Sequence, residues 1–87
     1  MILRALTAND HAQALVLYAE LMGDKPLATD PAHFQAVLDL PGTSVIGAEL
    51  DGVVRAMLTL HLLPNVTWGG RPYALIENVA TARSHQR

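Results

Sequence analysis

Residues 75–87 read LIENVATARSHQR, and this stretch gives the strongest indication of the fold. Its first half is apolar and contains several β-branched residues, which predicts a strand over residues 73–81. Its second half is polar and basic. The combination raises the question of what an apolar strand does when only a short basic run follows it in the sequence.

The composition is that of a folded protein. The chain has 87 residues, 51% of them hydrophobic and 16% charged, so we expect one globular domain over residues 1–87. A net charge of −2 and few aromatic residues, one Trp, two Tyr and one Phe, disfavour binding to nucleic acid. The absence of cysteine excludes a disulfide or thiolate site and is typical of a cytoplasmic protein. No apolar run is long enough to span a membrane.

Two helices are predicted in the first half of the chain. Thr7 and Asp10 have the spacing of a capping box, so a helix is expected over residues 9–22, before Gly23. A second helix begins at Asp30-Pro31, where an N-cap residue precedes proline. The side chains at helical spacing, which we expect to form the apolar faces, are Ala12, Leu15, Val16, Ala19 and Met22, widened by Leu17 and Leu21, in the first helix, and Phe34, Val37 and Leu38 in the second.

From residue 43 onward the apolar residues alternate, which predicts strands. Residues 43–50 and 53–63 are joined by Asp51-Gly52, a strong signal for a two-residue hairpin. Residues 64–72 are expected to form a loop before the last strand. With a first strand over residues 2–6, the order is β-α-α-β-β-β, which indicates the α+β class, a mainly antiparallel sheet with two helices. In the second strand of the hairpin the residues expected on one face are Val54, Ala56, Leu58, Leu60 and Leu62, and those on the other are Arg55, Met57, Thr59 and His61.

A few residues could carry chemistry. Glu77 is the only carboxylate in the predicted last strand and suits a general base if it is buried, although alternation favours a place on the solvent face. The small residues Val79, Ala80 and Thr81 leave backbone groups open to an extended ligand, as an ordinary strand end also does. His61 can line a cleft or lie on the surface. No two histidines have the spacing of metal ligands, so no metal site is expected.

The element order and the segment IENV, residues 76–79, resemble the GNAT superfamily of N-acetyltransferases over nearly the whole chain. In that family the corresponding strand is followed by a turn and a loop of the form Q/R-x-x-G-x-G/A, whose first two positions Gln86 and Arg87 match. The resemblance implies the acyl-CoA N-acyltransferase-like fold in partial form, as the N-terminal half of such a domain. Arg83 departs from the family pattern, which commonly has proline in this turn.

The resemblance implies an enzyme that transfers an acetyl group from acetyl-CoA to a primary amine of a small molecule or a peptide. Glu77 would be the catalytic base, acting directly or through water. The connection over residues 24–29 and His61 would lie on the acceptor side. The residues that would bind acetyl-CoA, by backbone pairing with the pantetheine arm or by opening the pyrophosphate loop, are Val79, Ala80, Thr81, Gln86 and Arg87.

The family's loop glycines and the helix that follows them are not among residues 1–87. Anion binding by such a loop needs backbone N–H groups at a helix N-terminus, so we expect weak acetyl-CoA binding and little activity from the chain alone. An exposed apolar last strand invites pairing with another chain, so we expect a homodimer through this strand or its face. The alternative function is a non-catalytic α+β protein-interaction module that self-associates.

Overall fold

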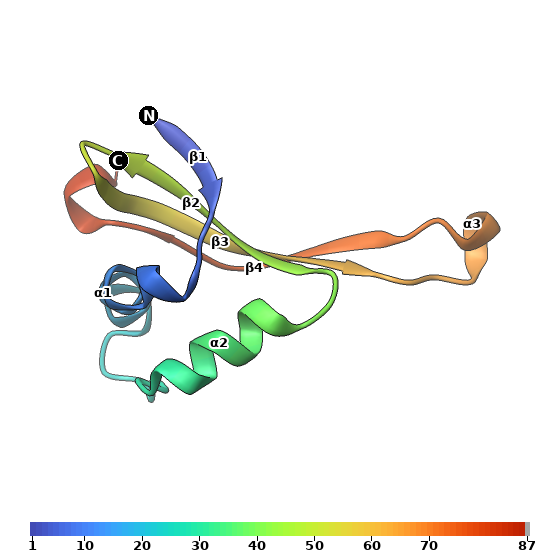
Figure 1. The fold of residues 1–87 in the computed structure, drawn as a ribbon, viewed down its shortest axis with the longest axis horizontal. Helices are drawn as coiled ribbons and strands as arrows, with labels where there is room; N and C mark the ends of the chain where they lie inside the picture. Colours follow the sequence, from blue (N-terminus) through green and yellow to red (C-terminus); the bar gives the residue numbers. More distant parts are fainter. Residues whose placement is uncertain (87) are drawn as a thin grey trace.

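The computed structural model describes residues 1–86 and contains one four-stranded antiparallel sheet with two helices packed on a single face (Figure 1). The sheet order is β1-β2-β3-β4, so strands that follow one another in sequence are neighbours in space. The predicted α+β class and the order β-α-α-β-β-β are confirmed. The principal elements are β1 (Ile2–Ala5), α1 (His11–Met22), α2 (Pro31–Asp39), β2 (Thr43–Leu50), β3 (Val53–Leu63) and β4 (Tyr73–Thr81).

The predicted capping residues precede both helices, although α1 begins at His11, two residues later than predicted. A 3₁₀ turn, η1 (Ala8–Asp10), leads into α1, and the Thr7 N–H donates to Oδ2 of Asp10 at 2.7 Å. The Ala32 N–H donates to Oδ1 of Asp30 at 2.9 Å, immediately before Pro31 occupies the first turn of α2. These bonds satisfy N–H groups that a helix start otherwise leaves unpaired.

Arg4 ties β1 to the start of α1 and to β2, a contact that the sequence did not reveal. Its guanidinium donates to both carboxylate oxygens of Asp10, at 2.8 and 2.9 Å, and to Oε1 of Glu49 at 3.0 and 3.2 Å. The bidentate hydrogen bonds from Arg4 hold the pKa of Asp10 at about 2, well below its ordinary value of 3.8. Asp10 therefore stays ionised although it is buried.

The buried face of α1 differs from the prediction. Ala14 and Leu17 are the buried residues of this helix, whereas Val16 is 59% exposed and Ala12 and Ala19 are exposed. Because α1 is apolar around most of its circumference, spacing alone did not identify the side that faces the sheet. The predicted face of α2 is confirmed, since the residues that are buried or packed on the core are Phe34, Val37 and Leu38.

The β2–β3 hairpin turns at Asp51 and Gly52, as predicted, and then carries a bulge at Arg55. The φ angles of the two turn residues, 53° and 77°, are those that a tight hairpin requires. Ala48 pairs with Ala56 and Glu49 pairs with Val54, so one step along β2 matches two steps along β3. The extra residue places Val54 on the helix-covered face, with Thr59. The prediction that Val54 shares a face with Ala56, Leu58, Leu60 and Leu62 is therefore wrong.

The other face of the sheet carries no helix among residues 1–86, and we call it the open face (Figure 1). The register pairs Ile46 with Leu58 and Leu60 with Ile76 on this side, opposite to the buried Val45. The side chains of the open face are mainly apolar and belong to all four strands: Leu3, Ile46, Ala48, Ala56, Leu58, Leu60, Leu62 and Ile76.

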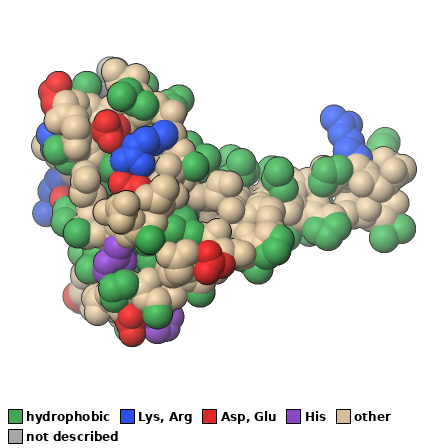
Figure 2. All heavy atoms as spheres, in the orientation of Figure 1, with side chains coloured by type: hydrophobic (Ala, Val, Ile, Leu, Met, Phe, Trp, Pro, Cys, Tyr) green, Lys and Arg blue, Asp and Glu red, His purple; other side chains and the backbone are tan. Residues whose placement is uncertain are grey.

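The β3–β4 hairpin extends beyond the body of the molecule as an arm (Figure 1). The predicted loop over residues 64–72 contains a single helical turn, α3 (Thr67–Gly70), at its tip. Apolar side chains cover much of the arm in the space-filling view (Figure 2), and Trp68 at the tip is 87% exposed. In the part of the chain that the structure describes, no helix has the length and apolar character needed to cross a membrane.

Candidate functional site

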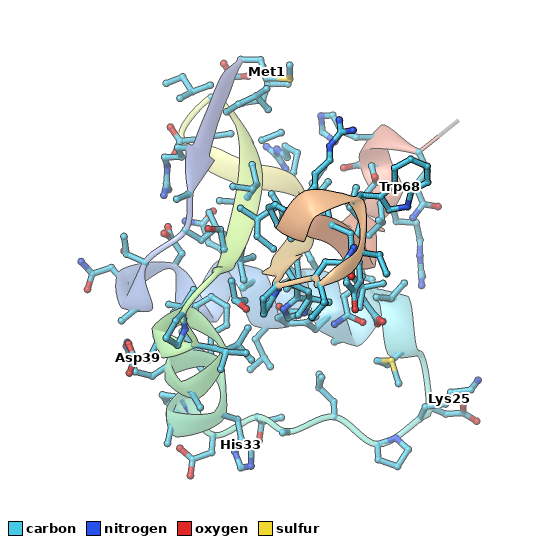
Figure 3. All side chains as sticks on the ribbon, turned by 90° about the vertical axis from the view of Figure 1, so that its right-hand side faces the viewer. Met1, Lys25, His33, Asp39 and Trp68 are labelled. Carbon is cyan, nitrogen blue, oxygen red and sulfur yellow. The ribbon has the colours of Figure 1, made fainter. Side chains whose placement is uncertain are left out.

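A cavity of about 360 Å³ lies on the helix-covered face, between α1, α2, their connection and the strands β3 and β4. This volume is within the range of small-molecule sites, roughly 300–1,000 Å³. Figure 3 shows the connection running between the labelled residues Lys25 and His33, and its middle lines the cavity. The apolar side chains that the two helices contribute to the wall include Leu15, Leu21, Met22, Phe34 and Val37.

Two polar side chains of β3, Thr59 and His61, form the floor of the cavity. They are two residues apart in the strand and so lie on the same face. Thr59 is 2% exposed, and its Oγ1 is buried without a hydrogen-bond partner among residues 1–86. The His61 ring is held by a 2.8 Å hydrogen bond between its Nδ1 and Oγ1 of Thr43. Because buried hydroxyls nearly always have a partner, the unpaired Oγ1 of Thr59 beside the cavity is an exception that needs a physical reason.

A bulge in β4 brings Asn78 to the same cavity. Met57 pairs with Ala80 and Thr59 with Glu77, so three steps along β4 match two along β3. Asn78 has a φ of 52°, in the left-handed region that asparagine adopts more readily than most residues. Asn78 was not predicted to be a site residue. The signal was present, because asparagine is rare inside strands and tolerates the backbone of a bulge.

Glu77, the predicted base, lies on β4 next to the floor of the cavity but does not line it. It is the register partner of Thr59, so their Cβ atoms are about 5 Å apart. Glu77 is exposed although its pairing with Thr59 places it on the helix-covered face, so burial gives no reason to make it a base. Its catalytic role stays a prediction.

The residues predicted to bind acetyl-CoA lie at the end of β4. Val79 is 60% exposed, Ala80 is buried and Thr81 is half-buried. Within residues 1–86, β4 pairs only with β3, so the backbone groups on its outer edge are unpaired by any strand. Nε2 of Gln86 donates to the carbonyl of Thr81 at 2.8 Å, which brings two of the predicted residues together. Arg87 lies outside the described residues.

The polar segment after β4 folds back on the body. The Ala82 N–H donates to the carbonyl of Arg55 at 2.6 Å, and the Arg83 N–H donates to Oε2 of Glu20 at 3.0 Å. A 3₁₀ turn, η2 (Arg83–His85), follows. The segment is therefore tied to β3 and α1 as far as residue 86. No group of three or more His, Asp or Glu side chains in the described part of the chain could hold a metal ion.

Several solved structures with the same fold are described as acetyltransferases. An inferred acetyltransferase from Agrobacterium tumefaciens strain C58 is 38% identical, with a TM-score of 0.92, over 99% of this chain and 62% of that chain. An acetyltransferase from Trypanosoma brucei is 25% identical, with a TM-score of 0.77, over 98% of this chain and 62% of that one.

An aminoglycoside acetyltransferase from an uncultured soil sample, at 24% identity and a TM-score of 0.78, shares the fold over 99% of this chain and 59% of its own. The chain therefore spans about three-fifths of the length of these structures, 59–62%. No protein-family model and no curated protein matches the sequence.

Proposed function

We propose that this chain, which has the fold of the N-terminal part of a GNAT N-acetyltransferase, belongs to an enzyme that transfers the acetyl group of acetyl-CoA to a primary amine. The observation that carries the proposal is the similarity to the Agrobacterium acetyltransferase, because a TM-score of 0.92 and 38% identity extend over 99% of the chain. A cytoplasmic location belongs to the same proposal and is supported by the absence of cysteine.

The end of β4 would bind the co-substrate. Its outer edge is free within residues 1–86, so the backbone of Val79, Ala80 and Thr81 can pair with an extended amide-containing arm as an added strand does. Gln86 and Arg87 would open the loop that holds the pyrophosphate. The contact between Gln86 and the Thr81 carbonyl supports this arrangement, because it places the loop start at the end of the strand.

The acceptor would approach from the cavity on the helix-covered face. In the reaction the neutral amine attacks the thioester carbonyl, a C–N bond forms and the C–S bond breaks. Before the attack the ammonium loses one proton to Glu77, directly or through one water molecule, and after the attack the nitrogen loses a second proton, which the leaving thiolate takes up. Glu77 is suited to this role by its position, since its register partner Thr59 lies in the cavity floor.

The proposal is tested by binding first and turnover second. Titration of acetyl-CoA into the isotope-labelled 87-residue chain should shift the backbone amide resonances of residues 79–81 and 86 most strongly. The affinity should be weak, and turnover by this chain alone should not exceed the uncatalysed rate. The natural protein that contains residues 1–87 should acetylate at least one amine, and Glu77→Gln should lower its kcat by about 100-fold. Amide shifts confined to other strands, or no turnover with any amine, would contradict the proposal.

A second function, self-association as a protein-interaction module, is favoured by the open face. Ile76 and Leu62 on this face are 56% and 54% exposed, and β4 presents an unpaired edge of nine residues within the described chain. Exposed apolar strands with a free edge pair with other chains. The chain would form a symmetric homodimer through β4 or the open face, and light scattering after size exclusion at micromolar concentration would detect it. A monomer throughout that range would contradict the dimer.

A further inference from the structure

We infer that the acceptor of this enzyme is a small monoamine with an apolar body, and that the cavity on the helix-covered face excludes polycations. The inference rests on the proposed acetyltransferase function and specifies its substrate class. Three observations carry it: the apolar wall of the cavity, the unpaired hydroxyl in its floor and its volume.

The wall of the cavity contains no fixed charge. Apolar side chains of α1, α2 and their connection make up most of it, and no Asp, Glu, Lys or Arg lines it within residues 1–86. A ligand with several ammonium groups would have to bury them without partners, which is strongly unfavourable. An aliphatic or aromatic body, in contrast, gains free energy by leaving water for this wall.

The floor of the cavity is polar, and His11, Tyr18 and His33 add polar groups elsewhere in the lining. Oγ1 of Thr59 is buried and unpaired among the described residues, and Asn78 and His61 line the cavity beside it. An amino group at this position can donate to Oγ1 of Thr59. Glu77, which is paired with Thr59 on the neighbouring strand, supplies an anion close to this position. One amine at the floor and an apolar body along the wall therefore match the distribution of polar and apolar groups.

The volume sets the size of the ligand. At about 30 Å³ per water molecule, a cavity of about 360 Å³ holds the equivalent of roughly a dozen waters. A ligand of about ten non-hydrogen atoms fills it, and an oligosaccharide amine would extend beyond it. 2-Phenylethylamine is a suitable probe, with spermidine as a polycation and the aminoglycoside kanamycin as a large polycation for comparison.

The test measures binding of the three probes to the 87-residue chain by calorimetry and by amide resonance shifts. We expect 2-phenylethylamine to bind at least tenfold more tightly than spermidine or kanamycin and to shift the resonances of residues 59, 61 and 78. Equal or tighter binding of either polycation, or no binding of 2-phenylethylamine at millimolar concentration, would overturn the inference.

Thr59→Val separates a ligand contact from a structural role. Removing the hydroxyl should weaken 2-phenylethylamine binding about tenfold, yet leave the melting temperature of the ligand-free chain unchanged or higher, because an unpaired buried hydroxyl is lost. The matched control Thr67→Val, at an exposed position on the arm, should change neither quantity. An unchanged affinity of Thr59→Val would overturn the inference.

Turnover by the natural protein that contains residues 1–87 distinguishes the two proposals. Preferred acetylation of kanamycin or spermidine would overturn the apolar acceptor and leave the acetyltransferase function standing. Selective binding of 2-phenylethylamine without acetylation of any amine would overturn the function and retain the cavity as a site for apolar amines.

Discussion

The two faces of the sheet differ in how their apolar side chains are covered. The helix-covered face combines a buried apolar core with two polar residues, Thr59 and His61, in the cavity floor, whereas the open face is mainly apolar and carries no helix within residues 1–86. Polar residues are commonly exposed and apolar residues buried. The polar floor of the cavity and the exposed apolar side chains of the open face therefore both need a physical reason. The covered face is polar where it lines a cavity, and the apolar open face is the surface through which the proposed dimer would form.

The two faces of the sheet should contribute differently to the stability of the fold and to its function. The core of the covered face consists of a few buried apolar residues, among them Leu17 and Val45, and these should hold the fold together. The most exposed side chains of the open face, Leu3, Leu62 and Ile76, are 54–68% exposed and should contribute little to folding of the monomer. A substitution of similar size on the two faces should therefore have very different consequences for the free energy of unfolding.

The largest effect is expected at Leu17, in the covered core. Leu17→Ala should lower the free energy of unfolding by about 3 kcal/mol or more, because it deletes three buried carbon atoms and leaves a cavity. The same change at Leu62, which is 54% exposed on the open face, should cost less than about 1 kcal/mol. Urea denaturation measured at a protein concentration at which all variants are monomeric gives both values. Similar losses at the two positions would refute the assignment of the faces.

A substitution on the open face, in contrast, should affect self-association more than the stability of the monomer. Ile76→Lys places a charge on this face and should weaken the proposed dimer about 100-fold, because the ammonium would be buried without a partner. Val16→Lys is the matched control, since Val16 is equally exposed but lies on α1, away from the open face. Sedimentation equilibrium of the two variants and the unmodified chain measures the difference. Equal weakening by both variants would contradict a dimer that forms through the open face.

Much of this arrangement could be predicted from the sequence, and the failures have physical causes. Element order, the turn at Asp51 and the start of α2 follow from local rules that act within a few residues. The bulges at Arg55 and Asn78 depend on how two strands pair, which no single segment encodes.

The site was only partly accessible from the sequence for the same reason. His61 was identified as a residue that can line a cleft, and it does line the cavity. Thr59 and Asn78 were not identified, because their importance comes from burial, an absent partner and a strand bulge. Such properties arise from tertiary packing and leave little trace in composition or spacing.

A smaller effect is expected from the ion pair beside the covered core. Because Arg4 holds the pKa of Asp10 at about 2, below its ordinary 3.8, the pair stabilises the fold fully above about pH 4. This contribution should be lost as pH falls from about 4 to 2. Asp10→Asn should lower the free energy of unfolding at pH 7 by about 1–2 kcal/mol and flatten its acid dependence. Asp24→Asn, in the exposed connection, should leave the pH dependence unchanged in thermal melts.

The smallest effect is expected at the tip of the arm, where neither face is covered. Trp68 is 87% exposed and has a φ of 55°, which is unfavourable for a bulky residue and easily adopted by glycine. Trp68→Gly should therefore change the free energy of unfolding by less than about 0.5 kcal/mol, because relief of the backbone offsets the greater freedom of the unfolded chain. Gly42→Trp is the reverse control: Gly42 also has positive φ, but a Cβ there would meet the Leu62 carbonyl oxygen at 2.7 Å, so unfolding should become much easier. A marked loss of stability in Trp68→Gly would mean that the arm, like the covered core, is held by contacts of its own.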